Sequence, residues 1–229
     1  MDPVGAATRA GVNPRPCNLL NNPNTQVALA YVHGETVKGI FMDSVVQNVL
    51  LDERNRRLVG AVKGLHGTIV PRVRNDAVRW FLKETTLPWL WFLDTDMQPA
   101  TYTLPDMLDA VSGVGPCIAS AATRGLVADG PKLTWLAEDG EGGLYFVLEP
   151  ESRCTEILAC GAACTLIHRE VLVAVERNHT KDSWPWFGHD LVNGQRQGED
   201  LTFCYRARAV GYHVYGVDTP VNHFKLMPI

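Results

Sequence analysis

The chain has 229 residues, of which 46% are hydrophobic and 20% are charged. This length and composition are ordinary for a soluble globular protein with one large domain or two small ones. The formal net charge of −4 gives no overall electrostatic signal for binding nucleic acid or an anionic membrane. No segment reaches the roughly 18 apolar residues of a membrane span, and the N-terminal stretch has no apolar core of signal-peptide length. We therefore expect a cytoplasmic protein without a membrane partner.

Residues 1–25 contain four prolines and five asparagines. A segment of this composition has little apolar surface to bury, so we expect a flexible N-terminal arm. The sequence contains no internal repeat, and the ordered part of the chain is expected over 26–229.

Short apolar runs alternate with helix-period patterns in the first half of the ordered chain. Such runs are typical of buried strands, whereas apolar residues that recur every three or four positions predict one buried face of a helix. The expected strands are 26–32, 57–62, 67–70 and 89–93, and the expected helices are 37–50 and 74–85. This alternation favours a mostly parallel sheet with helices on both faces.

The second half of the chain is less regular, because Gly-rich turns and small-residue segments interrupt its apolar runs. We expect a helix at 104–111, a strand at 117–122, a hairpin within 133–150, a strand, turn and helix within 155–176, a loop at 178–197, a helix at 199–211 and a strand at 212–217.

Two carboxylates, Asp94 and Asp96, follow the apolar stretch 87–93, in which only Pro88 is not large and apolar. Ligands of open parallel sheets bind beyond the carboxyl ends of the strands, and residues i and i+2 of a strand share one face. Carboxylates so placed repel each other unless a cation or hydrogen-bond donors lie between them. Mn²⁺ and Mg²⁺ prefer oxygen ligands of this kind. The pair therefore predicts a metal site or, alternatively, a solvated turn that Asp94 caps.

Cys160, Cys164 and His168 suggest a second metal hypothesis, because cysteine and histidine are ligands of zinc. Structural zinc sites normally have more closely spaced cysteine pairs than this. We therefore favour the alternative, in which the six cysteines of the chain are reduced and mostly buried.

Four stretches of the chain together form a longer pattern. They are VALAYVHGETV from residue 27, RVRNDAV from residue 72, WFLDTDM from residue 91, and the C-terminal stretch that begins with PWFG at residue 185 and ends with PVNH at residue 223. Their order and spacing resemble the GT-A fold glycosyltransferases, especially family 2 and its small phage-encoded relatives. The resemblance spans residues 26–223, which is nearly all of the chain expected to be ordered.

This resemblance implies an α/β fold of the GT-A (Rossmann-like) type, with a mostly parallel central sheet flanked by helices and a smaller mixed sheet on the acceptor side. It implies one domain over 26–229, with a nucleotide-binding half at about 26–100 and an acceptor half at about 101–229. The implied activity is metal-dependent transfer of a sugar from a UDP- or GDP-sugar to an acceptor hydroxyl. The implied acceptors are a protein, a glycan or a modified DNA base, and a phage-encoded enzyme would act in the host cytoplasm.

By the same resemblance, Asp96 and His223 bind Mn²⁺ or Mg²⁺, and Asp94 contacts the ribose or the metal shell. Asp200 is the base that deprotonates the acceptor hydroxyl, with Glu199 beside it. This assignment assumes inversion at the anomeric carbon, whereas a retaining enzyme would use the pair to orient the acceptor. The alternatives are a surface histidine at position 223 and simple capping of a helix start by the two acids.

The nucleotide is expected at Tyr31 and His33, which end the first strand. It is also expected at Arg74 and Asn75, which open a helix that can face a phosphate or a base edge. The alternative for Arg74 is an ordinary surface arginine. The family usually has a small residue and Asn where this chain has YVHG, which leaves the identity of the base open.

Two groups of residues are candidates for the donor and acceptor pocket. By resemblance, a segment of small residues lines the donor sugar, whereas the aromatic residues of the 178–197 loop either stack on sugar rings or anchor that loop in the core. The small residues are Gly161, Ala162 and Ala163, and the aromatic residues are Trp184, Trp186 and Phe187.

Two other activities remain open. A haloacid-dehalogenase-like phosphotransferase also has two aspartates at a strand end, the first of which is a nucleophile. That family normally has Thr or Val where this chain has Gln98, and its motif lies near the start of the chain. A nucleotide-sugar-binding protein without turnover would be expected to lack the Glu199–Asp200 pair or His223, and this chain has both.

Overall fold

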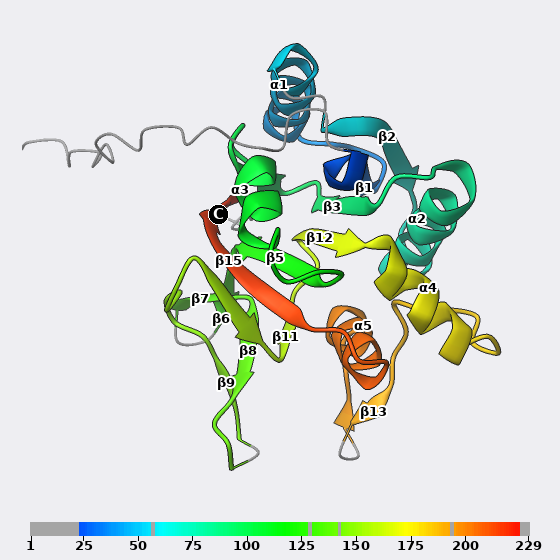
Figure 1. The fold of residues 1–229 in the computed structure, drawn as a ribbon, viewed down its shortest axis with the longest axis vertical. Coiled ribbons are helices and arrows are strands. Elements are labelled where there is room, and N and C mark those ends of the chain that lie inside the picture. Colours follow the sequence, from blue (N-terminus) through cyan, green and yellow to red (C-terminus); the bar gives the residue numbers. More distant parts are fainter. Residues whose placement is uncertain (1–22, 56–57, 128–129, 142, 193–194, 225–229) are drawn as a thin grey trace, which may run out of the picture.

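The computed structural model describes residues 23–55, 58–127, 130–141, 143–192 and 195–224. A seven-stranded sheet forms its centre, and helices pack on both faces of this sheet (Figure 1). The predicted arm at 1–25 lies outside the described residues, except for the short 3-10 helix η1 (Pro23–Thr25).

The strands of the central sheet are β1 (Val27–His33), β2 (Val59–His66), β3 (Trp89–Asp94), β5 (Ile118–Ala122), β10 (Cys154–Ile157), β12 (Cys164–His168) and β15 (Val214–Pro220). They lie in the order β10-β15-β5-β12-β3-β1-β2. β1 pairs in parallel with β2 and β3, and β5 pairs in parallel with β15. β12 is antiparallel to β3 and β5, and β10 is antiparallel to β15. The mostly parallel sheet that the sequence predicts is therefore confirmed.

Two layers of helices cover this sheet. The helices are α1 (Gly39–Asn55), α2 (Val70–Glu84), α3 (Thr103–Ala110), α4 (Arg169–Asn178) and α5 (Glu199–Ala209). Figure 1 shows α2, α4 and α5 along one face and α1 and α3 along the other, in agreement with the two hydrophobic clusters of the core. Within the described ranges, no helix has both the length and the hydropathy that crossing a membrane requires.

The two-sided core explains the long apolar run before the acidic pair. In β3, Leu90 and Phe92 pack in the cluster that includes α2, α4 and α5, whereas Trp91 and Leu93 pack in the cluster that includes α1 and α3. All four side chains are fully buried. Because alternate strand residues point to opposite faces, a strand that is covered on both sides has to be apolar at every position.

One expected strand is wrong. Residues 67–70 form no strand, since Ile69 is the N-cap residue of α2 and the helix begins at Val70. Pro71 lies in the first turn of that helix, where its fixed φ angle and missing N–H favour a helix start. The segment 155–176 also contains more strands than expected, because it includes β11 (Ala159–Cys160) between β10 and β12.

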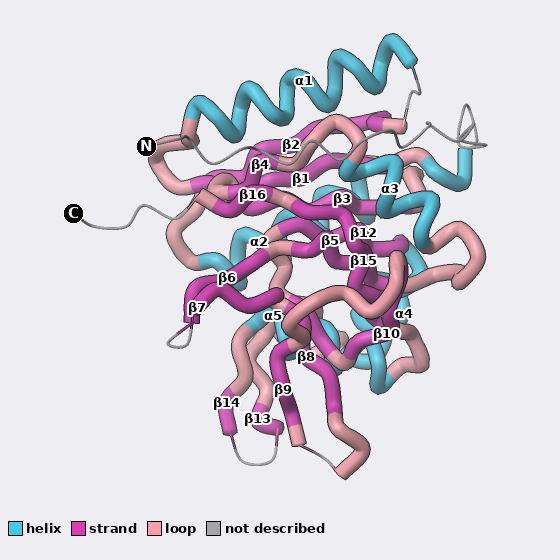
Figure 2. The backbone as a smooth tube through the Cα atoms, turned by 90° about the vertical axis from the view of Figure 1, so that its left-hand side faces the viewer, coloured by secondary structure: helices cyan, strands magenta, loops and turns pink. Residues whose placement is uncertain are grey.

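Short strands form smaller antiparallel sheets around the central one. They are β4 (Met97–Gln98) with β16 (Asn222–His223), β6 (Arg124–Val127) with β7 (Gly130–Leu133), β8 (Trp135–Glu138) with β9 (Leu144–Phe146) and β11, and β13 (Leu191–Val192) with β14 (Gln195–Arg196). The hairpin expected within 133–150 is confirmed by β8 and β9. Figure 2 shows that this hairpin and the β13–β14 pair extend from the same end of the molecule.

Trp135 joins the β11-β8-β9 sheet to the central sheet. Its buried indole packs against Gly216 of β15, where a Cβ atom would lie 2.6 Å from the ring. The indole N–H donates to Ser120 Oγ and to the Ala121 carbonyl oxygen, each at 3.3 Å. Gly216 thus provides the space in which the anchoring side chain of the smaller sheet packs.

Replacing Gly216 by alanine should destabilise the fold, because the added methyl group overlaps an indole that its hydrogen bonds and neighbours hold in place. Overpacking of this kind costs about 1–3 kcal/mol. Gly113→Ala is the matched control, since a Cβ atom there meets nothing within 4 Å, and its effect should stay within about 0.5 kcal/mol. Urea unfolding followed by tryptophan fluorescence measures both variants, and equal stabilities would contradict the packing described here.

Candidate functional site

Arg74 of α2 connects two acidic residues of the site. Its Nη2 donates to both carboxylate oxygens of Asp94, at 3.0 and 2.9 Å, and its Nη1 donates to Glu199 Oε1 at 2.9 Å. Asp94 is the last residue of β3 and Glu199 is the first residue of α5. A single guanidinium group therefore holds the end of a strand and the start of a helix together.

The surroundings of Arg74 explain why it needs these partners. Only 4% of the residue is exposed, and the rings of Phe92 and Phe187 lie 5.9 and 5.8 Å from the guanidinium carbon. Burial by itself lowers the pKa of Arg74, but the neighbouring carboxylates outweigh burial and raise that pKa above its usual value. Since a buried charge without a partner is strongly unfavourable, Arg74 fixes the positions of Asp94 and Glu199.

Asp96 and His223 meet although they are 127 residues apart in the sequence. His223 lies in β16, which pairs with β4 directly after Asp96. The His223 Nε2 atom is 3.0 Å from Asp96 Oδ2, and its Nδ1 atom is 2.8 Å from the carbonyl oxygen of Arg124. The backbone N–H of Phe224 donates to the Asp96 carbonyl oxygen at 2.8 Å. The predicted metal ligands Asp96 and His223 are therefore brought together.

Both ring nitrogens of His223 face an acceptor, whereas a neutral imidazole carries only one N–H. In one tautomer, Nδ1 donates its proton to the Arg124 carbonyl oxygen. In the neutral ring, Nε2 then directs its lone pair at the Asp96 carboxylate, and two acceptors face each other at 3.0 Å. Either a second proton on the ring or a cation shared by the two side chains resolves this conflict.

The same separation fits a divalent ion. Two ligands that lie about 2.1 Å from an octahedral Mg²⁺ at a right angle to each other are about 3.0 Å apart. No cluster of three or more His, Cys, Asp or Glu side chains suited to a metal occurs within the described residues. Asp94, which the sequence also placed among the metal ligands, accepts hydrogen bonds from the Arg74 guanidinium with both oxygens, and its role at a metal stays a prediction. An ion at Asp96 and His223 would thus take further ligands from substrate phosphates and water.

Asp200 lies beside the small-residue segment that follows β11. Its Oδ2 atom would be 3.5 Å from a Cβ atom at Gly161, and its Oδ1 atom accepts the backbone N–H of Leu201 at 2.8 Å. The pKa of Asp200 lies above its ordinary value, and burial is the largest cause of this increase. The positive charge of Arg74 lowers the pKa, whereas the negative charge of Glu199 raises it. A carboxylate with a raised pKa accepts a proton more readily, as a general base requires.

The segment from Gly161 to Ala163 runs between the acidic groups. The carbonyl oxygen of Ala163 accepts the N–H of Asp94 at 2.8 Å, and the N–H of Gly161 donates to the carbonyl oxygen of Thr134 at 2.9 Å. A side chain at Gly161 would bring its Cβ atom within 3.2 Å of Thr134 Cβ, and Ala162 is buried. Small residues thus let this segment approach both acids, and its role at the donor sugar stays a prediction.

Asn75, Trp186 and Phe187 are core residues, and their contacts with nucleotide or sugar stay a prediction. All three are 0% exposed. The Asn75 Nδ2 group donates to the Phe187 carbonyl oxygen at 3.0 Å, and its Oδ1 atom accepts the Trp186 N–H at 3.2 Å. They anchor the loop, which was the alternative for the two aromatic residues. Arg74 likewise contacts protein carboxylates where a nucleotide was expected, whereas Trp184 is partly exposed and stays a candidate for sugar contact.

Tyr31 and His33 lie at the carboxyl end of β1, level with Asp94 at the end of β3. Both side chains are partly exposed. The ring of His33 lies 5.5 Å from that of His66, which ends the neighbouring strand β2. This edge of the sheet therefore offers aromatic surfaces close to the acids, and the nucleotide contacts of Tyr31 and His33 stay a prediction.

The cysteines do not form the zinc site that their spacing suggested. The Sγ atom of Cys160 lies 3.9 Å from that of Cys204 on α5, while the His168 ring packs edge-on against Trp89 at 4.6 Å. Burial raises the pKa of Cys164 to about 12, which keeps its thiol protonated and makes it a poor metal ligand. Among the residues with described positions, no metal-binding cluster includes these side chains.

Two positively charged residues that shape the site were not recognised from the sequence. Lys38, in the loop after β1, donates from Nζ to the carbonyl oxygen of Phe224. Arg206 of α5 donates to both oxygens of Asp190, at 2.8 and 2.5 Å, and so fixes the loop that precedes its own helix. No motif marks either residue, because each contact joins segments that only the folded chain brings together.

No family model matches this chain, and neither does any curated protein. Among solved structures, the crystal structure of A197 from STIV is similar, with a TM-score of 0.59 and 18% identity over 87% of this chain and 86% of that one. The crystal structure of GalNAc-T7 with UDP, GalNAc and Mn²⁺ is also similar, with a TM-score of 0.56 and 14% identity over 88% of this chain. The match covers 43% of the GalNAc-T7 chain, so this protein spans less than half of its length.

Identities this low indicate a shared fold and no more. The seven-stranded, mostly parallel sheet with helices on both faces and small antiparallel sheets beside it agrees with these similarities. The fold that the sequence resemblance implied is therefore correct, and the chain has a GT-A-like fold.

Proposed function

We propose that this protein is a metal-dependent glycosyltransferase that moves a sugar from a nucleotide-sugar donor to an acceptor hydroxyl. The observation that carries the proposal is the 3.0 Å approach of Asp96 and His223 at the edge of a GT-A-like sheet. The presence of UDP, GalNAc and Mn²⁺ in the GalNAc-T7 structure supports a nucleotide sugar as donor, linked to UDP or GDP.

On this proposal, Asp96 and His223 hold Mn²⁺ or Mg²⁺. When bound, such an ion supplies Lewis-acid neutralisation of the charge on the departing diphosphate. The Arg124 carbonyl oxygen lies 2.8 Å from His223 Nδ1; by accepting a proton there, it would leave the Nε2 lone pair free to hold the ion. Arg74 positions Asp94 on the donor side and Glu199 on the acceptor side.

Asp200 acts as the base in a reaction that inverts the anomeric carbon. The acceptor oxygen forms a bond to that carbon, the bond from the carbon to the diphosphate oxygen breaks, and the hydroxyl proton moves to the Asp200 carboxylate. Glu199 raises the pKa of Asp200 through its charge and thereby supports the proton transfer.

The rival activities give different results in one experiment. A phosphotransferase needs a free nucleophile, whereas both oxygens of Asp94 accept hydrogen bonds from Arg74. UDP- and GDP-sugars are incubated with the protein and Mn²⁺, and released nucleoside diphosphate is measured by chromatography. Slow release in water, accelerated by an acceptor, supports the transferase, whereas tight binding without any release indicates a binding protein.

Asp96→Ala should abolish the Mn²⁺-dependent stabilisation of the protein by UDP or GDP, because the metal loses its carboxylate ligand. Thermal unfolding with nucleotide, with and without Mn²⁺, measures this effect. Glu176→Ala removes an exposed carboxylate of α4 and should respond like the wild type. A metal-dependent shift that persists in Asp96→Ala would exclude Asp96 as a ligand.

Asp200→Asn should lower the transfer rate by roughly 10²-fold while leaving donor affinity unchanged by calorimetry. Acidification protonates the Asp200 carboxylate and should therefore lower the wild-type transfer rate. Because the pKa of Asp200 is raised, the midpoint of this fall should lie at a pH above about 3.9, the usual pKa of aspartate. The variant should lose this acidic limb, since asparagine does not titrate. Glu199→Gln should do less damage. Near-normal transfer by Asp200→Asn would assign the base to another group.

Arg74→Lys should lower transfer at saturating donor by about 10-fold or more, because lysine keeps the charge but cannot bridge two carboxylates, and small misplacements of reacting groups are costly. Arg79→Lys is the control, since Arg79 lies on the same helix and its side chain is 46% exposed. Among the acidic residues that the structure describes, Arg79 forms an ion pair only with Asp76. Equal rates for both variants would show that the Arg74 bridge does not position the site.

A further inference from the structure

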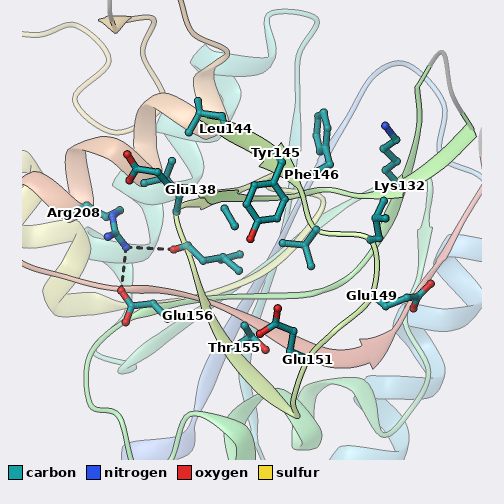
Figure 3. Close-up of a pocket in the computed structure, with 15 residues that line it drawn as sticks. Lys132, Glu138, Leu144, Tyr145, Phe146, Glu149, Glu151, Thr155, Glu156 and Arg208 are labelled. Carbon is teal, nitrogen blue, oxygen red and sulfur yellow. Dashed lines mark hydrogen bonds and ion pairs between the residues drawn. The ribbon is translucent and has the colours of Figure 1, made fainter. Parts of the chain in front are cut away.

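A groove of about 870 Å³ lies between the β8–β9 hairpin and β10. Figure 3 shows Tyr145 pointing into its middle, with Glu156 and Arg208 at one end and Lys132 and Glu149 at the other. None of the residues of the proposed transfer site lines this groove. It is therefore a separate surface feature of the protein.

Large apolar side chains are exposed along the hairpin strand that borders the groove. In β9, the consecutive residues Leu144, Tyr145 and Phe146 are 54, 47 and 40% exposed, and Leu148 that follows is 63% exposed. Because consecutive strand residues point to opposite faces, Leu144 and Phe146 lie together on one face of the hairpin and Tyr145 lies on the other, which faces the groove (Figure 3). Neighbouring exposed apolar side chains such as Leu144 and Phe146 mark a surface that binds another molecule.

β9 is also an edge strand, and within the described residues no strand pairs with its outer side. It ends the sheet order β11-β8-β9, and the N–H of Val147 donates to the Trp135 carbonyl oxygen at 3.0 Å. Hydrogen-bonded and non-hydrogen-bonded pairs alternate along an antiparallel ladder. Leu144 and Phe146 therefore direct their backbone N–H and C=O groups away from β8, which is the arrangement that an added strand requires.

The charge of the groove is negative. Four glutamates line it, against one lysine and one arginine. Arg208 is already paired with Glu156 at 3.3 Å. In the part of the chain that the structure describes, Glu138 and Glu151 form no ion pair. Two carboxylates thus remain available to a cationic ligand next to the apolar edge.

We propose that this groove binds an extended polypeptide segment in which basic and apolar residues alternate, and that the segment adds as a strand to the free edge of β9. In an extended segment, alternate side chains point to opposite faces, so the apolar face can meet Leu144 and Phe146 while the basic face enters the groove near Tyr145 and Glu151 (Figure 3). Glu138, which pairs with Leu144, adds negative charge beside the apolar face. Backbone hydrogen bonds provide affinity, and the alternating side chains provide specificity. The proposal concerns a polypeptide partner and does not depend on the transfer reaction.

Fluorescence anisotropy with two labelled peptides, KVKVKVKV and EVEVEVEV, tests the proposal. The lysine peptide should bind the full chain saturably, and the glutamate peptide should not. Phe146→Pro removes one outward N–H and no bond to β8, so it should weaken binding of the lysine peptide by about 3–10-fold. Glu138→Lys with Glu151→Lys should weaken it by about 10-fold or more, since like charges repel across an interface.

Glu84→Lys with Glu176→Lys provides the matched control, because these exposed glutamates lie outside the groove and change the net charge equally. This control should bind the lysine peptide like the wild type. Circular dichroism verifies the fold of each variant, and if Phe146→Pro does not fold, the two charge-reversal variants decide the question. Equal binding of both peptides, or equal loss of binding in the groove variant and the control variant, overturns the proposal.

Discussion

A buried positive charge has to be neutralised where it lies, and Arg74 imposes this requirement on the whole site. At 4% exposure, its guanidinium group is closed off from bulk water, so Asp94 and Glu199 must end next to it. The end of β3 and the start of α5 are thereby held at a fixed separation. In the proposed transferase, the acids that serve donor and acceptor form one electrostatic unit, with Asp200 directly after it in the chain.

The metal-ligand pair depends on a second constraint, which is the return of the C-terminal segment to the edge of the sheet. β16 pairs with β4, the N–H of Phe224 donates to the Asp96 carbonyl oxygen, and Lys38 donates to the carbonyl oxygen of Phe224. These contacts come from different parts of the chain and together hold His223 beside Asp96. Because none of them is local, the proposed metal site can form only when the whole sheet has assembled.

The sequence by itself determined most of the elements and their order. The run 89–93 predicts a buried strand because every position is apolar, and the two-sided core requires this. The end of that run in turn placed Asp94 and Asp96 at the carboxyl edge of the sheet, where ligands bind. The resemblance to GT-A fold glycosyltransferases predicted the fold correctly. The false strand at 67–70 arose because a short apolar run has no period that distinguishes a strand from a helix start, and Pro71 lies in the first turn of α2.

Only the tertiary structure decided which charges pair and which aromatic residues are available to a ligand. Nothing in the sequence distinguished Trp186 in the core from Trp184 at the surface, because aromatic side chains suit both places. The sequence likewise did not show that Asp94 would pair with Arg74 and Asp96 with His223. The physical reason is that periodicity reports how one element is buried, while a site consists of contacts between elements, whose partners carry no signal in their own spacing.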